Sequence, residues 1–444
     1  MKNSGIRPII VLDDDPTGTQ TVHDIDVYTD WSAESIAAGF KTPVFFVLTN
    51  SRSFSAERTI EVHREIARTI LAQGRDFIVV SRGDSTLRGH YPIETAAMAE
   101  VFAENNLPID GEIIVPFFPE GGRITQGDIH YVRQGDDLTP AAETEFARDK
   151  TFGYKSSDLK DWVEEKTAGA YKASDVLSVS LDLVEAEDPD KITKITDILC
   201  QCKDFRKVIV NATEYGHLRV FAKAFREAEA RGKRFIFRSA AAMVKVLADV
   251  SDQPLLSPAQ LQDPGNTNGG LVIVGSHVAK TTAQVEALLA DGKMEFIELN
   301  QHLALDPPAF AKEAQRVLDL TAANISAGKD TLVMTRRERF DLGGSQEDEL
   351  ALAVTIGDQL VSIANRLPVR PSFVIAKGGI TSSDVATKGL KIKKARVAGQ
   401  ILPGVPVWQA GPESKFPGLM LVIFPGNVGD ENALLMAVNK FVSI

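Results

Sequence analysis

An uninterrupted apolar run that ends in three acids, PIIVLDDDPTGT at residues 8–19, indicates the fold class of this chain. Similar runs, rich in Val, Ile and Phe and ending abruptly at Gly, Asp or Ser, recur along the sequence. They are VFFVLTNS (44–51), FIVVSRGDS (77–85), EIIVPFF (112–118), KVIVNAT (207–213), RFIFRSA (234–240), LVIVGSH (271–277), TLVMTRR (331–337), FVIAKGG (373–379) and LVIFPGN (421–427). Because continuous apolar runs are typical of strands buried on both faces, they predict parallel sheets covered by helices.

Helix-like stretches alternate with these runs. Residues 55–73, 215–230 and 281–290 carry apolar side chains at helical spacing, and each stops just before or near a glycine. The alternation predicts an α/β fold, with two α/β domains, mainly parallel sheets and Rossmann-like loops at the strand ends. We expect a first domain over residues 1–253, a linker over 254–270 (PLLSPAQLQDPGNTNGG) and a second domain over 271–444.

Composition narrows the range of functions. The chain has 444 residues and a net charge of -11, which disfavours a general nucleic-acid binder, because such proteins need a basic face. Its two cysteines, Cys200 and Cys202, make neither a disulfide framework nor a zinc pattern. No apolar run has the length of a membrane span or of a signal peptide. We therefore expect a cytoplasmic protein that binds neither nucleic acid nor membrane.

The residues just after each apolar run deserve most weight, because ligands of open α/β sheets collect at the carboxyl ends of the strands. Asp13, Asp14 and Asp15 follow the first run, and one of them could act as a general base toward a hydroxyl. Asp13, Asp15 and Thr17 also match the D-x-D-x-T loop of haloacid-dehalogenase-type phosphatases. A phosphatase therefore remains an alternative, although no acidic pair suited to magnesium follows another apolar run.

Two further loops carry groups suited to a hydroxylated anion. Arg82, Asp84, Ser85 and Arg88 lie on one loop, where arginine can grip a carboxylate and the other side chains can take hydroxyls. A purely structural Arg–Asp network is the other interpretation of the same residues. The segment PFFPEGGRITQGDIHYV at 116–132 adds two candidate substrate-binding side chains, Arg123 and His130.

Three glycine-bearing loops follow apolar runs in the second half of the chain. They are GSH at 275–277, KGGITS at 377–382 and PGNVG at 425–429. Glycine lets backbone N–H groups approach phosphate oxygens, and a following helix N-terminus adds positive potential. The stretch GSHVAKT at 275–281 is not a P-loop, because Ala279 stands where the glycine before the lysine is required.

Taken together, these motifs resemble the four-carbon acid sugar kinase family over essentially the whole chain. The resemblance is carried by DDDPTGT (13–19), GDSTLRGHYPIE (83–94), GGRITQGDIHYV (121–132), VGSHVAKTTAQV (274–285), KGGITSSDVA (377–386) and FPGNVGD (424–430). It implies that residues 1–253 form a sugar-acid-binding domain and residues 271–444 a nucleotide-binding domain. It also implies that the acid is bound by Asp14, Arg82, Asp84, Ser85 and Arg88, with Arg123 and His130 as further candidates. It implies that ATP is bound by Ser276, Gly378, Gly379, Ile380, Thr381 and Gly426.

The same resemblance implies a reaction. The γ-phosphoryl group of ATP would pass to the terminal hydroxyl of a tetronate, such as threonate or erythronate, or of a 3-oxo-tetronate. Arg82 and Arg88 would hold the carboxylate, and Asp14 or Asp84 would accept the hydroxyl proton. Mg²⁺ would bridge the phosphates, and we assign it no protein ligand. The alternatives left open are the phosphatase and a non-catalytic sugar-acid sensor. The expected partners are a small sugar acid and ATP, and a homodimer is left open.

Overall fold

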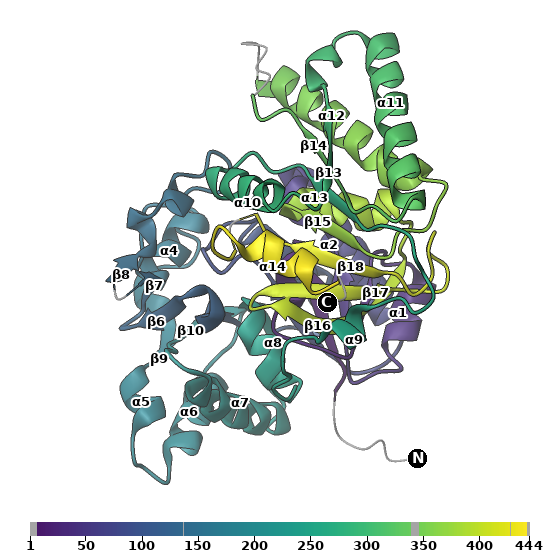
Figure 1. Cartoon of the computed structure of the whole chain (residues 1–444). Helices are drawn as coiled ribbons and strands as arrows, with labels where there is room; N and C mark the ends of the chain where they lie inside the picture. Colours follow the sequence, from purple (N-terminus) through teal and green to yellow (C-terminus); the bar gives the residue numbers. More distant parts are fainter. Residues whose placement is uncertain (1–6, 136, 339–345, 427, 442–444) are drawn as a thin grey trace. The chain divides into compact units, whose positions relative to one another are not determined.

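The computed structural model describes residues 7–135, 137–338, 346–426 and 428–441. The chain forms two compact units. The N-terminal unit comprises Met1–Val22 and Asp30–Asp252, and the C-terminal unit comprises His23–Thr29 and Gln253–Ile444. Figure 1 traces the order of their helices and strands along the chain. No helix among the described residues is long and apolar enough to cross a membrane.

The N-terminal unit is built on a parallel sheet. Its described strands run in the order β3 (Val44–Leu48), β1 (Ile9–Asp13), β4 (Ile78–Arg82), β11 (Phe235–Ser239), β5 (Gly111–Val115), β10 (Arg206–Val210) and β9 (Leu177–Val179). Every residue of β1, β3, β4, β5 and β11 is buried, as continuous apolar runs require. The predicted α/β class with mainly parallel sheets is confirmed here.

The helices of this unit follow from their apolar stripes and caps. The main ones are α1 (Ala33–Gly39), α2 (Ala56–Leu71), α3 (Ile93–Glu104), α4 (Leu159–Lys166), α5 (Leu181–Glu185), α6 (Lys191–Cys200), α7 (Tyr215–Ala230) and α8 (Ala241–Leu247). In α2, the Ser55 hydroxyl accepts the N–H of Arg58, and Val62, Ile66 and Ile70 are buried on one face. The helix stops before Gly74, whose φ of 60° suits a glycine C-cap.

The segment after β5 differs from the sequence-based expectation. The sequence of residues 120–150, rich in polar groups and without a regular apolar pattern, predicts an irregular segment. The structure instead contains a small antiparallel sheet of β6 (Arg123–Gln126), β7 (Ile129–Gln134) and β8 (Asp137–Pro140). These strands are short and joined by tight turns at glycines, so their apolar signal is too weak to be recognised from sequence alone.

The C-terminal unit contains a mixed sheet. From β13 (Glu295–Leu299) the order continues through β14 (Thr331–Thr335), β12 (Leu271–Val274), β15 (Val374–Lys377) and β18 (Met420–Phe424), all parallel. Three antiparallel strands complete it: β17 (Val405–Ala410), β16 (Lys394–Leu402) and β2 (Ile25–Tyr28). Residues near the N-terminus thus supply a strand to this unit.

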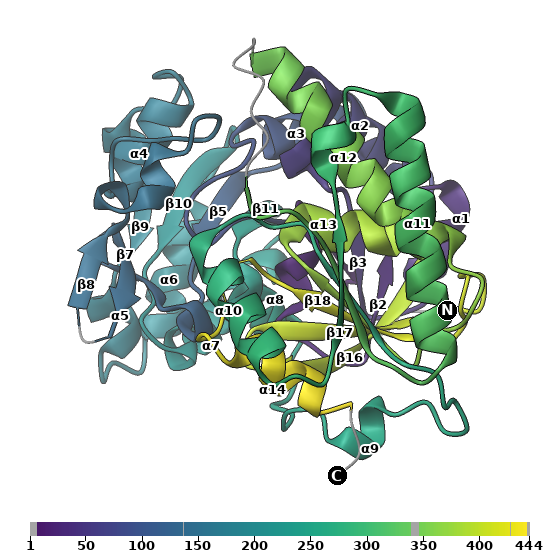
Figure 2. The same ribbon diagram turned by 45° about the horizontal axis from the view of Figure 1, so that its top comes forward.

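Helices cover the C-terminal sheet. They are α10 (Ala279–Ala290), α11 (Pro307–Ser326), α12 (Gln346–Arg366), α13 (Gly379–Asp384) and α14 (Ala433–Asn439), and the long α11 and α12 lie side by side (Figure 2). The segment 254–270 contains the short helix α9 (Pro258–Leu261). Leu256 and Leu261 join the C-terminal core, and the N–H of Leu256 donates to the carbonyl of Gln400 at 2.8 Å. The division of labour between two domains stays a prediction.

A buried ion pair links two neighbouring strands of the N-terminal sheet. Lys207 of β10 and Glu112 of β5 are register partners, with Nζ 2.7 Å from Oε2, and both side chains are almost inaccessible to water. The Lys207 ammonium also lies 3.6 Å from the centroid of the Phe205 ring. Burial lowers the pKa of Lys207, while Glu112 opposes that shift. The pair is therefore held together by mutual neutralisation in a water-free environment.

Removing one member of this pair should destabilise the N-terminal unit strongly. Lys207→Met would leave Glu112 buried and unpaired, so we expect the free energy of unfolding to fall by about 3–5 kcal/mol. The double variant Glu112→Leu/Lys207→Met should lose less than Lys207→Met alone. Urea denaturation followed by circular dichroism measures both. As a control, Lys172→Met removes an exposed partner of Glu164 and should cost less than about 1 kcal/mol. A Lys207→Met variant as stable as this control would contradict the expectation.

Candidate active site

Three neighbouring parallel strands bring charged residues to one edge of the N-terminal sheet. Asp13 ends β1 and Arg82 ends β4, and the two are register partners. On the other side of β4, Ser239 of β11 pairs with Arg82, and Arg238 precedes it on the same strand. Because parallel strands end at the same edge, residues far apart in the sequence meet here.

The turn after β1 buries the first acid. Asp15 caps a short 3-10 helix, and its Oδ1 accepts the N–H of Thr17 at 2.8 Å. A Cβ atom added to Gly18 would lie 2.1 Å from Oδ1 of Asp13. A residue with a side chain could not occupy this position without displacing the carboxylate. The turn therefore closes over Asp13, which is 1% exposed.

Two arginines contact the three acids. Arg52, in the turn after β3, donates from Nε to Oδ2 of Asp14 at 3.2 Å and from NH2 to Oδ1 at 2.6 Å, and its NH1 lies 3.4 Å from Oδ2 of Asp15. NH1 of Arg82 donates to Oδ1 of Asp13 at 3.0 Å and to Oδ1 of Asp14 at 3.1 Å. The predicted residues Asp14 and Arg82 thus meet. Sequence reasoning missed Arg52, although it too follows closely after an apolar run.

The three carboxylates differ in proton affinity. Burial raises the pKa of Asp13 to about 8, although the nearby Arg82 lowers it. Burial likewise raises the pKa of Asp14, against the pull of Arg52 and Arg82. Burial pushes the pKa of Asp15 upward too, but Arg52, Arg82 and the bonds from Thr17 outweigh it and hold that pKa below its usual value. One cluster therefore holds both ionised and readily protonated acids.

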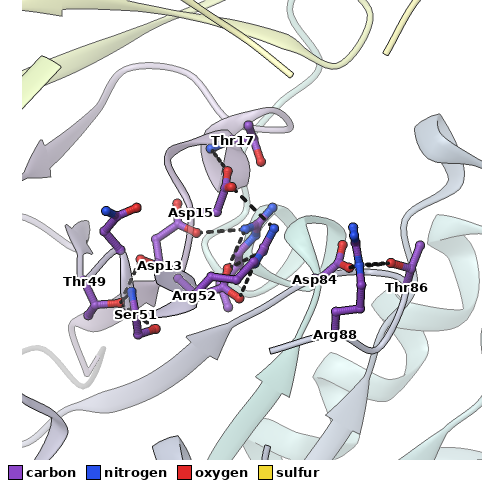
Figure 3. A network of polar contacts seen from close by, with 12 residues as sticks. Asp13, Asp15, Thr17, Thr49, Ser51, Arg52, Asp84, Thr86 and Arg88 are labelled. Carbon is purple, nitrogen blue, oxygen red and sulfur yellow. Dashed lines mark hydrogen bonds and ion pairs between the residues drawn. The ribbon is translucent and has the colours of Figure 1, made fainter. Parts of the chain in front are cut away.

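The loop after β4 forms a second group. Nε of Arg88 donates to Oδ2 of Asp84 at 2.6 Å, and the Thr86 hydroxyl donates to the same oxygen (Figure 3). The Arg88 guanidinium lies over the Phe146 ring, 5.0 Å from its centroid. Burial works against ionisation of Asp84, but Arg88, Arg52 and these bonds hold its pKa well below its usual value. Asp84 is therefore a weak base.

Two other predicted residues, His130 and Arg123, lie beside this loop. Both ring nitrogens of His130 are engaged, with Nε2 2.7 Å from the carbonyl oxygen of Ser85 and Nδ1 3.0 Å from the Thr125 hydroxyl. Burial lowers the pKa of His130 to about 4, so the ring is neutral. Arg123 lies over the Phe146 ring at 5.6 Å and donates to the carbonyl of Gly121. His130 thus positions the Ser85 backbone.

Arg238 differs from the other arginines of this edge. It is 5% exposed, and its NH2 donates to the carbonyl of Arg88 at 3.0 Å, with no carboxylate within ion-pair distance among the described residues. Beside it, Nε of Arg82 and Oγ of Ser239 are buried without a hydrogen-bond partner. Buried polar atoms without partners often mark the position of a missing ligand. The run RFIFRSA contains Arg238, but sequence reasoning treated it only as a strand.

Gly89 lies between Arg238 and Asp14. A Cβ atom there would be 3.2 Å from NH2 of Arg238 and 3.3 Å from Oδ2 of Asp14, and the residue has a φ of 116°. Gly83 is tighter still, because a Cβ would lie 1.2 Å from NH1 of Arg238. Both glycines of the GDSTLRG stretch therefore make room for the same guanidinium, and Gly89 keeps the way open between a cation and a carboxylate.

The glycine loops of the C-terminal unit also meet through strand register. Val274, Lys377 and Phe424 end β12, β15 and β18, and they are paired across the three parallel strands. Nζ of Lys377 donates to the carbonyl of Pro425 at 2.6 Å. Burial, with Lys280 nearby, lowers the pKa of Lys377 to about 7. This lysine therefore ties one glycine loop to the next.

Several predicted nucleotide contacts lie close together here. A Cβ on Gly378 would be 3.3 Å from Cβ of Ser276 and 3.2 Å from Oγ1 of Thr381, and a Cβ on Gly426 would be 3.4 Å from Oγ of Ser276. Gly379 begins α13 and Ile380, the next residue, is 64% exposed. The structure thus brings the predicted residues of the three loops to one edge.

A cation missed by sequence reasoning also reaches these loops. NH1 of Arg337 donates to the carbonyl of Ser276 at 2.6 Å and NH2 donates to Oγ1 of Thr282 at 2.5 Å, while its Nε is buried without a partner. It follows the run TLVMTRR, so its position after a strand was the available signal. With Lys280 and Lys377 it makes the loops basic, which fits a polyphosphate. Among the described residues, no group of three His, Cys, Asp or Glu side chains could hold a metal ion.

Comparison with known proteins assigns the family. The model of a sugar-binding N-terminal domain matches residues 9–247, and that of a nucleotide-binding C-terminal domain matches residues 271–434. The chain belongs to the four-carbon acid sugar kinase family. The resemblance seen in the sequence motifs is therefore confirmed.

Individual relatives are more distant. D-erythronate kinase of Heliobacterium modesticaldum is 24% identical over 320 residues, which cover 70% of this chain and 66% of the relative, or less than two thirds of its length. A crystal structure of a Haemophilus influenzae protein superimposes with a TM-score of 0.64 and 19% identity, covering 98% of this chain and 100% of the other. That of the putative tRNA synthase from Salmonella typhimurium has a TM-score of 0.71 and 18% identity, covering 99% and 100%. These two structures support the fold.

The raised pKa of Asp13 predicts a pH dependence of stability. The folded protein holds this proton up to about pH 8, whereas the unfolded chain releases it near pH 3.8. The stability contributed by Asp13 is therefore full below about pH 4 and is lost as the pH rises through about 8. Asp13→Asn cannot titrate, so its free energy of unfolding should rise relative to the wild type between pH 5 and pH 8.

Denaturant unfolding at several pH values measures this difference. Asp128→Asn serves as the control, because the pKa of Asp128 is lowered, so its stabilisation is lost only in acid, and Asp128 is not among the main groups that shift the pKa of Asp13. The control should differ from the wild type by a constant amount between pH 5 and pH 9. A constant difference for Asp13→Asn over the same range would show that Asp13 is ionised in the folded protein.

Proposed function

We propose that this protein is a kinase that transfers the γ-phosphoryl group of ATP to the terminal hydroxyl of a four-carbon sugar acid, such as erythronate, threonate or a 3-oxo-tetronate. The observation that carries the proposal is the buried edge where Arg238, without a carboxylate partner, stands across Gly89 from Asp14. A small hydroxylated anion would supply the carboxylate that Arg238 lacks. Family membership and the distant D-erythronate kinase support the same class of reaction.

The carboxylate anchor is Arg238, together with the unused Nε of Arg82 and the hydroxyl of Ser239. This modifies the sequence-based expectation that Arg82 and Arg88 share the task. Arg88 donates to Asp84, and NH1 of Arg82 is already bound to Asp13 and Asp14. A guanidinium without a carboxylate partner gains most from a substrate carboxylate, because it does not have to give up an existing ion pair.

Asp14 is the stronger of the two candidate bases. Burial raises its pKa, so it can accept a proton from a hydroxyl, while Asp84 is held ionised by Arg88 and Arg52 and is a poor acceptor. The role of Asp84 is then to orient Arg88. Phosphoryl transfer depends mainly on positioning and on neutralising charge, which are the tasks that this cluster performs.

ATP would be held by the glycine loops of the C-terminal unit. Ser276, Thr381 and Gly426 surround the space for the phosphates, while Lys280 and Arg337 supply positive charge. Ile380 in the first turn of α13 and Val278 just before α10 are exposed apolar side chains suited to the face of the adenine base. Mg²⁺ bound to the phosphates would neutralise their charge, since Mg²⁺ in kinases is held largely by phosphate and water.

The phosphatase alternative requires Asp13 to be an ionised, accessible nucleophile. Asp13 is instead buried under the turn at Gly18, and burial raises its pKa to about 8. A sugar-acid sensor without catalysis would not need a proton acceptor such as Asp14 beside the anchor. Both alternatives are therefore disfavoured by the environment of the three acids. Cytoplasmic location and a homodimer stay predictions.

Asp14→Asn should separate the kinase from the phosphatase. We expect labelled phosphate from ATP to appear on an acid from a panel of four-carbon sugar acids, with no labelled protein. Asp14→Asn should lower kcat by a factor of about 10²–10⁴, with the KM for ATP nearly unchanged. Asp84→Asn, the matched control, should act mainly on the KM of the acid. Phosphate transfer trapped on Asp13, or phosphate release from a sugar phosphate without ATP, would contradict the proposal.

Arg238→Met should weaken binding of the acid specifically. Loss of a charge-assisted pair costs about 3 kcal/mol, so the KM of the acid should rise about 10²-fold while that of ATP changes little. Arg238→Lys keeps the positive charge but cannot bind a carboxylate with two parallel hydrogen bonds. Its KM for the acid should therefore lie between those of the wild type and Arg238→Met. Arg234→Met is the control, because Arg234 immediately precedes the other end of β11 and forms an ion pair with the exposed Asp76. If Arg238→Met leaves the KM of the acid within threefold of the wild type, the carboxylate is bound elsewhere.

A further inference from the structure

A cavity lies at the opposite end of the N-terminal strands from the candidate active site. It has a volume of about 680 Å³, within the range of roughly 300–1,000 Å³ that is common for small-molecule sites. Ile9 and Val44, the first residues of β1 and β3, form part of its lining. The candidate site lies at the last residues of the same strands, so the two sites are separate.

The lining combines an apolar floor with a basic wall, and it also includes two acids, Glu229 and Asp249. Val246 and Leu247, at the end of α8, extend the apolar surface of Ile9 and Val44. Helix α7 contributes the wall, with Arg219, Lys223 and Arg226 at a spacing that places them on one face. This row of side chains is basic although the whole chain carries a net charge of -11.

Two charges of this wall form no ion pair among the described residues, although Asp252 interacts electrostatically with Arg219. Arg226 pairs with Glu229 at 2.9 Å, and Arg7 pairs with Glu229 at 3.1 Å. Neither Arg219 nor Lys223 has a carboxylate within ion-pair distance in the part of the chain that the structure describes. Like charges four residues apart repel each other on a helix. An anion between them would remove that repulsion and gain two charge-assisted bonds.

We propose that this cavity binds a small organic anion with an apolar body. The anionic group, a carboxylate, sulfonate or phosphate, meets Arg219 and Lys223, and the apolar body lies on Val44, Val246 and Leu247. The size of the cavity suits a metabolite rather than a peptide or a single ion.

The cavity is connected to the candidate active site by one short helix. Helix α8 begins at Ala241, two residues after Ser239, and ends at Leu247 in the cavity. NH2 of Arg226 donates to the carbonyl of Leu247 at 3.1 Å, which ties the basic wall to the end of this helix. An occupant that shifts α8 therefore also shifts the strand end that carries Arg238. We expect occupancy to change the affinity for the sugar acid, an expectation that rests on the proposed function.

Binding is tested with 8-anilinonaphthalene-1-sulfonate, which joins an aromatic body to one sulfonate, by fluorescence titration of the full-length protein. Arg219→Glu/Lys223→Glu should weaken binding at least tenfold. Ala222→Trp, which fills the cavity without changing charge, should do the same. Lys203→Glu/Lys312→Glu makes the same change in net charge elsewhere and should bind as the wild type does. If Arg219→Glu/Lys223→Glu and Ala222→Trp both bind the dye as tightly as the wild type does, the proposal is overturned. If only Ala222→Trp loses affinity for the dye, the role of Arg219 and Lys223 in binding the anionic group is overturned.

Coupling is tested by calorimetric titration of D-erythronate with and without a saturating amount of the same dye. The dissociation constant should change at least fivefold, a usual size for coupled sites, and should not change in Ala222→Trp. An unchanged constant in the wild type, with the dye bound, overturns the coupling. If D-erythronate and the other four-carbon acids do not bind at all, the proposed function fails, whereas the dye titration still decides the cavity.

Discussion

The structure of the N-terminal unit depends on the burial of three consecutive carboxylates at the end of one strand. Charges of the same sign cannot be taken out of water together unless cations or protons compensate them. Arg82 comes from β4, on one side of β1, and Arg52 comes from the turn after β3, on the other side. A proton on Asp13, whose pKa is raised to about 8 by burial, compensates the third carboxylate. The strand order β3–β1–β4 is therefore a requirement of the acid cluster as well as a feature of the fold.

This compensation also explains how the charges at the sheet edge are divided. Arg52 forms an ion pair with Asp14, Arg82 forms one with Asp13, and Arg88 forms one with Asp84. The remaining guanidinium, that of Arg238, donates to the carbonyl of Arg88, and Gly83 and Gly89 leave the space that it occupies. A site that must release its product gains from this division, because its internal pairs stay intact when the ligand leaves. The glycine loops of the C-terminal unit follow a similar principle, with Lys377 bound to carbonyl groups of the loop and Lys280 and Arg337 beside it.

Much of this arrangement could be predicted from the sequence, for identifiable reasons. All ten apolar runs became parallel strands, because a strand buried on both faces has a strong and continuous signal. Strands β16 and β17 and the small sheet at residues 123–140 were missed, since half-buried or short strands lack that signal. Asp14, Arg82 and Asp84 were found because they directly follow such runs. Arg238 was overlooked because it lies within a run, and its lack of an acidic partner is visible only once the neighbouring strands are in register.

The short strand β2 has a consequence for how the chain is held together. Residues 23–29 belong to the C-terminal unit, yet both segments that flank them belong to the N-terminal unit. The polypeptide therefore passes from one unit to the other three times. A protease that cut only between Asp252 and Gln253 would leave two fragments that remain associated, because Ile25–Tyr28 of one fragment stays hydrogen-bonded to β16 of the other. In evolutionary terms, the two units could no longer be exchanged as independent modules, since the first part of the gene encodes a strand of the C-terminal unit's sheet.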